Sequence, residues 1–175
     1  IDLLSSLGTT KFLFNSLRYF GRPSQKDLDN ANYILHLPAI PSEPKKVPFL
    51  SQEEVIKSFA DALDNYGINC KIELSNRVLS QVMVLNSKKT ILINPNAKFT
   101  KKEVNALIEH EIGVHMVTTQ NSVDQKLKLF NLGLPVNTQT QEGLAILSEY
   151  LSGNITLKRL KKLAFRVVVV DMMCN

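Results

Sequence analysis

The sequence predicts an α+β domain in which a small, mostly antiparallel sheet packs against helices, and three observations indicate this class. Apolar side chains recur at helical spacing over residues 52–66. Between residues 71 and 93 the pattern changes to short β-branched runs separated by turns. From Thr100 onward the helical spacing returns, and it carries a group of histidine and glutamate residues.

The length of 175 residues and the apolar content of 44% fit one domain, residues 1–175. We divide it into a helical and proline-rich N-terminal part, residues 1–50, and a core, residues 51–175. The chain opens on Ile1 within an apolar helical pattern and ends soon after Met173. We therefore expect a fragment or a processed form of a longer protein.

The formal net charge of +5 comes from short basic runs that are spread along the chain. Such runs fit solvated helix faces better than a surface for an acidic partner, so we expect no nucleic-acid binding. The longest purely apolar run, residues 167–170, is far too short for a membrane span. The two isolated cysteines, Cys70 and Cys174, fit a reducing, cytoplasmic setting. No feature of the sequence indicates an oligomeric state.

The N-terminal part predicts helices followed by a connector. A helical pattern over residues 2–20 is divided by Gly8, and Ser24 opens a capping box that predicts a short helix to about Leu35. Four prolines between residues 38 and 50 fix their own backbone angles and favour extended geometry. These residues therefore predict a stiff extended connector.

The core begins with a capping box at Ser51, which predicts the helix over residues 52–66 that Gly67 ends. Strands are expected at residues 71–74, 81–85 and 90–93. After Thr100 a helix is expected to about Thr118, followed by a helical turn around residues 126–130. Two further helices are expected, one over residues 139–151 after Thr138 and a last one after Thr156.

The most informative stretch holds two histidines and a glutamate within six positions: His110, Glu111 and His115. Imidazole nitrogen and carboxylate oxygen are ligands of catalytic zinc, which keeps three protein ligands and one open position for water. In the common helical zinc motif the histidines are four residues apart, whereas here they are five apart.

Five residues of regular α-helix would turn one ring about 140° away from the other. A π-helical turn, whose hydrogen bonds join residues five apart, absorbs the extra residue, and Gly113 makes that distortion easy. We therefore predict a widened or broken helix between Glu111 and His115.

A third ligand is predicted on a later helix, where Glu142 follows a loop. This order is similar to that of zinc peptidases of the thermolysin and aminopeptidase type. Gly143 would let the two helix backbones approach closely. Glu149, two turns further along, lies on the same face as Glu142 and is placed to accept the remaining N–H of a histidine ligand.

The residues alone leave a second interpretation open. Each histidine, taken singly, also fits a structural or solvent-facing role. Glu142 also fits a carboxylate that the helix dipole favours in a first turn.

Two stretches together carry a family resemblance: His110-Glu111-Ile112-Gly113-Val114-His115 and Gln141-Glu142-Gly143-Leu144-Ala145. Over roughly residues 67–173 the chain resembles the bacterial family with a QEGLA motif, described as modulating flavohaemoglobin expression. It is similar also to the eukaryotic microtubule-associated tyrosine carboxypeptidases, which carry an HExxxH motif and a later EGLA glutamate. Gln141 departs from the eukaryotic members, which often have an acid there.

The resemblance implies a zincin fold of the gluzincin type. It implies that His110, His115 and Glu142 bind Zn²⁺ and that Glu111 is the catalytic base. The implied function is that of a zinc-dependent metallopeptidase, of the carboxypeptidase type, which hydrolyses a peptide or the C-terminal segment of a protein. The alternative is a regulatory or interaction protein that retains a zinc site without catalysis.

The substrate side of this function is predicted from the sheet and from the basic residues. A sheet edge, either residues 81–85 or residues 90–93, would align an extended peptide by strand addition. Arg77 is our candidate for the cation that binds a substrate's terminal carboxylate, with Lys71 and Arg166 as weaker candidates.

Overall fold

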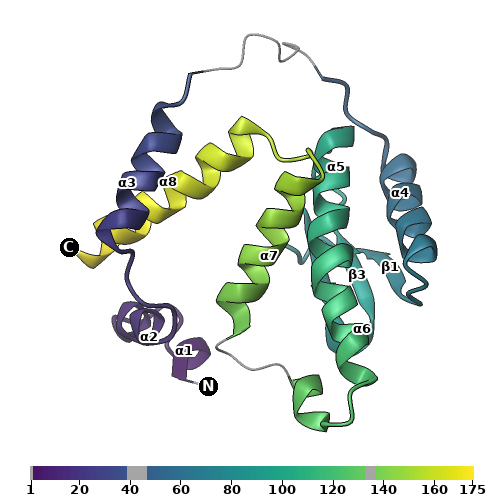
Figure 1. The fold of residues 1–175 in the computed structure, drawn as a ribbon, viewed down its shortest axis with the longest axis horizontal. Coiled ribbons are helices and arrows are strands. Elements are labelled where there is room, and N and C mark those ends of the chain that lie inside the picture. The colour runs from purple at the N-terminus through teal and green to yellow at the C-terminus, as the bar shows by residue number, and fades with distance from the viewer. Residues whose placement is uncertain (1, 39–46, 133–136) are drawn as a thin grey trace. The chain divides into compact units, whose positions relative to one another are not determined.

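The computed structural model describes residues 2–38, 47–132 and 137–175 (Figure 1). The chain forms two compact units, one made of Ile1–Glu43 and Thr156–Asn175 and the other of Pro44–Ile155. The single domain predicted for residues 1–175, with a division at residue 50, stays a prediction beside this grouping. No helix in the described part of the chain is both long enough and apolar enough to cross a membrane.

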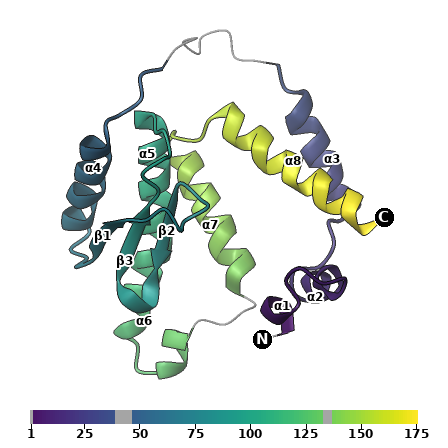
Figure 2. The same ribbon diagram turned by 180° about the vertical axis from the view of Figure 1, so that it is seen from behind.

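The first unit is helical. Its helices are α1 (Asp2–Ser5), α2 (Lys11–Phe20), α3 (Gln25–His36) and α8 (Leu157–Cys174). Gly8, with a φ of 77°, separates α1 from α2 as predicted. The Ser24 capping box is confirmed, and the Thr156 hydroxyl caps α8. α3 packs along α8 (Figures 1 and 2). Most of the predicted connector lies outside the described residues.

The second unit carries the sheet. Its α-helices are α4 (Gln52–Asn65), α5 (Lys101–Leu107), α6 (Val117–Val123) and α7 (Thr138–Leu151). Its strands are β1 (Lys71–Leu74), β2 (Val82–Leu85) and β3 (Thr90–Ile93). Short 3₁₀ turns lie at η1 (Asn86–Lys88) and η3 (Lys128–Leu132). A π-helix, η2 (Ile108–Met116), joins α5 to α6. Residues 101–123 are therefore one continuous helix, called the motif helix below, which runs past the predicted end at Thr118.

The sheet is mixed, with the strand order β1-β3-β2. β3 is antiparallel to β2 but parallel to β1, with Thr90 opposite Lys71. The prediction of a mostly antiparallel sheet is therefore wrong for one of the two pairings. β3 occupies the centre because its residues are the most buried of the three strands, with Ile91 and Ile93 almost fully enclosed. Strand order thus follows burial and not the order along the chain.

The central position of β3 also corrects the predicted substrate edge. Both edges of β3 are paired, so residues 90–93 cannot accept an added strand. The edge strands of the described sheet are β1 and β2, and β2 contains most of the other predicted segment, residues 81–85.

The core lies between the sheet, α4 and the motif helix. Its buried residues include Val55, Phe59 and Leu63 from α4, Val82, Ile91 and Ile93 from the strands, and Val104, Ile112 and Met116 from the motif helix. Figures 1 and 2 show the motif helix along one face of the sheet, with α7 beside it. The predicted α+β class is confirmed.

Candidate metal centre

The motif helix is fixed at its start and along one side. The Thr100 hydroxyl accepts a hydrogen bond from the Glu103 N–H at 3.3 Å, and the Glu103 carboxylate accepts one from the Thr100 N–H at 2.8 Å. This predicted capping box satisfies two donors that the helix itself leaves without partners. Further along, Ile112 is completely buried in the core. Because these contacts anchor the helix, the residues of its remaining face have defined positions.

The predicted widening of the helix is confirmed. The π-helix η2 covers the whole interval between His110 and His115. In a π-helix, residues about five positions apart are joined by a hydrogen bond and lie one above the other. The two side chains therefore emerge on the same side of the helix. Their ring centroids are 5.0 Å apart, and the ring planes meet at 77°.

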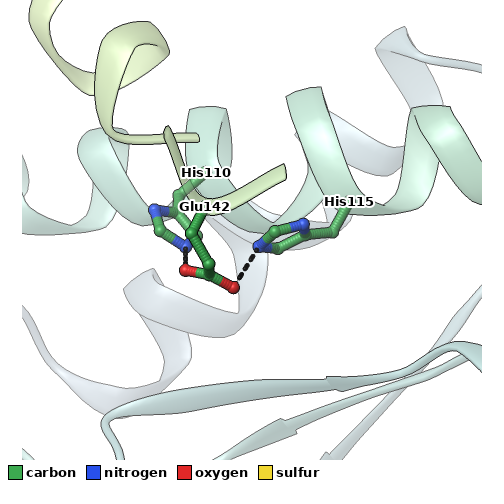
Figure 3. A group of neighbouring side chains, drawn as sticks. All are labelled: His110, His115 and Glu142. Atoms are coloured by element: carbon green, nitrogen blue, oxygen red, sulfur yellow. Dashed lines mark ion pairs between the residues drawn. The ribbon is translucent and has the colours of Figure 1, made fainter. Parts of the chain in front are cut away.

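Glu142 reaches the two histidines from α7, which packs along η2. Its Oε2 lies 3.6 Å from Nε2 of His110, and its Oε1 lies 3.5 Å from Nε2 of His115. Figure 3 shows the carboxylate between the two rings. One donor atom from each residue falls within 4.8 Å of the others. The structure thus brings together the three side chains that the sequence suggested as ligands.

The start of α7 differs from the expectation. Thr138 is its first residue and not its cap; the cap position is Asn137, which makes no side-chain capping bond. The reason is that Asn137 has a helical backbone, with ψ −13°, and lacks the extended geometry that lets a side chain reach back to the first turn.

Glu149 contacts the ring nitrogen of His110 that faces away from Glu142. Its Oε1 lies 2.8 Å from Nδ1 of His110, and both residues are buried. Because a buried carboxylate accepts the Nδ1–H, the lone pair of this imidazole is left on Nε2, the atom that faces Glu142. The hydroxyl of the preceding residue, Ser148, lies 2.7 Å from the Ala145 carbonyl of its own helix and 3.2 Å from the Glu109 carbonyl of the motif helix, so its one proton is shared between the two.

His115 lies in a different electrostatic environment. Burial is the main cause that lowers its pKa below the usual value, and the neighbouring His110 lowers it further. Glu142 and a hydrogen bond with the side chain of Gln141 oppose these effects and raise the pKa. The net lowering favours the neutral imidazole, which is the form that binds a metal ion.

A cleft of about 630 Å³ opens beside His115 and Glu142. The described residues that line it come from the end of the motif helix, from the loop after it, from η3, and from the cap and first turn of α7: Thr118, Asn121, Ser122, Gln125, Phe130, Asn137, Thr138 and Gln141. Most are uncharged amides or hydroxyls. The sequence analysis missed this cleft and the contact of Gln141, although Thr118, Ser122 and Gln125 follow His115 at helical spacing.

The remaining predicted residues are one neighbour of His110 and three basic residues outside the cleft. Glu111 is partly buried on η2, directly after His110. Arg77 is exposed in the loop between β1 and β2 and is not among the described residues that line the cleft. Lys71 is exposed on β1, and Arg166 is exposed on α8 in the other unit. The substrate-binding role of these cations stays a prediction.

Comparison with known proteins adds a family assignment. The sequence model of the family described as "Microtubule-associated tyrosine carboxypeptidase" matches residues 1–175, which extends the likeness beyond residues 67–173. No curated protein and no solved structure matches the chain. The family description names a carboxypeptidase, and the match over the full length covers the motif helix and α7. The chain therefore belongs to the microtubule-associated tyrosine carboxypeptidase family, a family of carboxypeptidase-like peptidases.

Proposed function

We propose that the chain is a zinc-dependent metallopeptidase of the carboxypeptidase type. In this proposal His110, His115 and Glu142 hold the zinc ion, and Glu111 is the general base. The observation that carries the proposal is the convergence of the three side chains, from two separate helices, to within 4.8 Å of one another.

The distances fit a zinc ion better than direct hydrogen bonds. Two zinc–ligand bonds of about 2.1 Å that meet at a tetrahedral angle place their ligand atoms about 3.4 Å apart. The two nitrogen–oxygen distances here are 3.5 and 3.6 Å, and each joins a different oxygen of Glu142 to one imidazole. Hydrogen bonds from N–H to O are typically about 2.7–3.2 Å long. Two imidazoles and one carboxylate are also a donor set that catalytic zinc uses.

The surroundings support a catalytic centre over a closed structural one. Three protein ligands leave a fourth coordination position for water. The side chain of Glu142 is 55% exposed, whereas that of His110 is 9% exposed. One side of the group is therefore held in the protein and the other faces the cleft, where a substrate has access.

In this proposal Glu111 transfers the proton, and Glu149 and Gln141 orient the two histidine ligands. Zinc, when bound, polarises the scissile carbonyl and lowers the pKa of a water molecule. Glu111 accepts the proton of that water and later delivers it to the leaving amine. Glu149 keeps His110 in one orientation and one tautomer through the bond to Nδ1. Gln141 helps to orient the ring of His115 through its side-chain hydrogen bond.

The substrate we propose is a peptide or the C-terminal segment of a protein. β2 contacts η2, and it is an edge strand of the described sheet. An extended peptide that adds to this edge runs past the metal centre with its backbone hydrogen-bonded to β2. The cleft lined by Phe130 and the amide side chains then takes one substrate side chain. The narrower likeness to the bacterial QEGLA family rests on residues 110–115 together with residues 141–145 and belongs to this proposal.

The experiment combines metal analysis with peptide cleavage. The purified chain is loaded with zinc and crystallised, and we expect an anomalous scattering peak between His110, His115 and Glu142. A peptide library analysed by mass spectrometry then reports whether residues are removed from the C-terminus. The library is also treated with Glu111→Gln, which lacks the proposed base, and the matched control is Glu53→Gln, at an exposed carboxylate on α4.

Two outcomes would count against the proposal. Zinc bound anywhere other than this group contradicts the ligand assignment. Zinc at the site of a protein that cleaves no library peptide favours the alternative, a regulatory protein that retains a zinc site.

A further inference from the structure

A hydroxyl and a carboxylate lie directly over Gly113, in the middle of the π-helix. A Cβ atom built on Gly113 would be 3.1 Å from Oη of Tyr66 and 3.3 Å from Oε2 of Glu109. Contacts of this length are tighter than ordinary van der Waals contact. Gly113 has an ordinary negative-φ backbone, unlike most other glycines described. Its lack of a side chain therefore serves close approach and not backbone freedom.

The two groups over Gly113 are joined to each other and to different helices. Burial, and then the charge and hydrogen bond of the neighbouring Glu109 carboxylate, raise the pKa of the Tyr66 hydroxyl above its usual value. Tyr66 directly follows α4, which Phe59 and Leu63 fix in the core. The backbone carbonyl of Glu109 lies 3.2 Å from the Ser148 hydroxyl of α7, which shares its one proton with the Ala145 carbonyl at 2.7 Å. Glu109 is thus held by α4 through its side chain and by α7 through its backbone.

We propose that Tyr66 and Glu109 are positioning residues that clamp the widened turn around Gly113 and thereby keep His110 and His115 on one face. A relaxation of η2 to a regular α-helix would turn one imidazole about 140° from the other. The clamp opposes this change because the hydroxyl and the carboxylate cover the turn that would have to narrow. The part of this inference that concerns the metal rests on the proposed function.

The first test is independent of any metal. Amide hydrogen exchange is followed by mass spectrometry in the metal-free full chain, in Tyr66→Phe and in Gly113→Ala. Tyr66→Phe removes only the hydroxyl, and Gly113→Ala adds a methyl group where the two oxygens now lie. Loss of a hydrogen bond of this kind corresponds to about a tenfold change in the opening equilibrium. We expect amides 110–116 to exchange about tenfold faster in both variants.

Two matched controls separate the clamp from general effects. Tyr150→Phe removes the hydroxyl of an exposed tyrosine on α7. Gly143→Ala adds a methyl group at a glycine with no neighbouring atom within 4 Å, so the expectation that Gly143 allows a close helix approach is wrong. Both controls should exchange like the wild-type chain over residues 110–116. Tyr66→Phe keeps the test decisive if Gly113→Ala does not fold.

The second test measures the consequence for the metal. Zinc affinity is determined by competition with a chelator, and the visible spectrum of the Co²⁺ form reports the ligand geometry. We expect Tyr66→Phe to weaken zinc binding by about tenfold, the same factor as the change in the opening equilibrium, and to alter the Co²⁺ spectrum. In the double variant Tyr66→Phe with Gly113→Ala, the fold-loss of zinc affinity should be smaller than the product of the two single fold-losses, because both substitutions remove the same contact. A purely structural role would lower stability and leave the spectrum unchanged.

The outcomes of the two tests are separable. If Tyr66→Phe and Gly113→Ala leave exchange over residues 110–116 at the wild-type rate, the clamp is overturned whatever the metal does. If exchange rises but the zinc affinity and the Co²⁺ spectrum stay unchanged, the positioning role is overturned. If the wild-type chain binds no zinc, the proposed function falls, and the exchange experiment still decides the clamp.

Discussion

Glu149 on α7 lies 2.8 Å from Nδ1 of His110 on the motif helix, and only 2% of Glu149 is exposed. A carboxylate so deeply buried is stable only with a strong partner. The contact joins the two helices that carry the proposed ligands. Loss of either side chain should therefore lower both the metal affinity and the stability of the fold.

Glu149→Ala should weaken zinc binding by about 10–100-fold, the range known for partners of metal-bound histidines. The cause is that His110 loses the acceptor that fixes its ring and its tautomer. Glu149→Gln keeps an acceptor oxygen, so its zinc affinity should fall less than that of Glu149→Ala. Chelator competition measures both variants, with the exposed Glu73→Gln on β1 as control. Unchanged affinity in Glu149→Ala would show that the contact is only structural.

The proposed roles of Glu111 and Glu142 predict different variant behaviour. Glu142→Ala should lose zinc and activity together, because two imidazoles hold the ion too weakly. Glu111→Gln should keep zinc and the fold but slow peptide hydrolysis by about 10²–10⁴-fold, the usual effect of losing a general base. Metal content and initial rates are measured side by side. Hydrolysis at the wild-type rate by Glu111→Gln would exclude Glu111 as the base.

The stability of the metal-free protein should depend on His115 at mildly acidic pH. Burial and the nearby His110 lower the pKa of folded His115 below 6.5. When the pH falls through 6.5, His115 of the unfolded chain takes up a proton before the folded one does. The unfolded state then binds more protons, so this residue reduces stability as the pH falls and has no such effect well above 6.5.

His115→Gln removes this proton linkage. Between pH 7.5 and pH 5, roughly the range in which histidine titrates, its Tm should fall less than that of the wild-type chain. Thermal unfolding followed by circular dichroism in the presence of a chelator measures the difference. Identical slopes of Tm against pH would contradict the lowered pKa.

Ile112 links the metal centre to the core, since it lies between the two histidines and is 0% exposed. Ile112→Ala should reduce the free energy of unfolding by about 2–5 kcal/mol, through lost burial and the cavity left behind. Urea unfolding measures this change. Leu79→Ala, at a fully exposed residue, is the control and should have little effect. A small loss in Ile112→Ala would mean that the core closes around the missing side chain.

Local features of the chain were determined by the sequence itself. The capping boxes at Ser24, Ser51 and Thr100 start helices where predicted, because a capping box needs only residues three apart. The widening of the motif helix also followed from the sequence. It depends on the five-residue spacing of His110 and His115, and both lie on one element. The grouping of Glu142 with them was expected from motif order and family likeness.

Only the tertiary structure decided the relationships between distant segments. β3 took the centre of the sheet, against the predicted arrangement, because burial of Ile91 and Ile93 depends on α4 and the motif helix. Tyr66 meets Glu109, and Gln141 meets His115, through the packing of separate helices. No local pattern encodes such contacts, because the free energy that selects them comes from burial summed over the whole core.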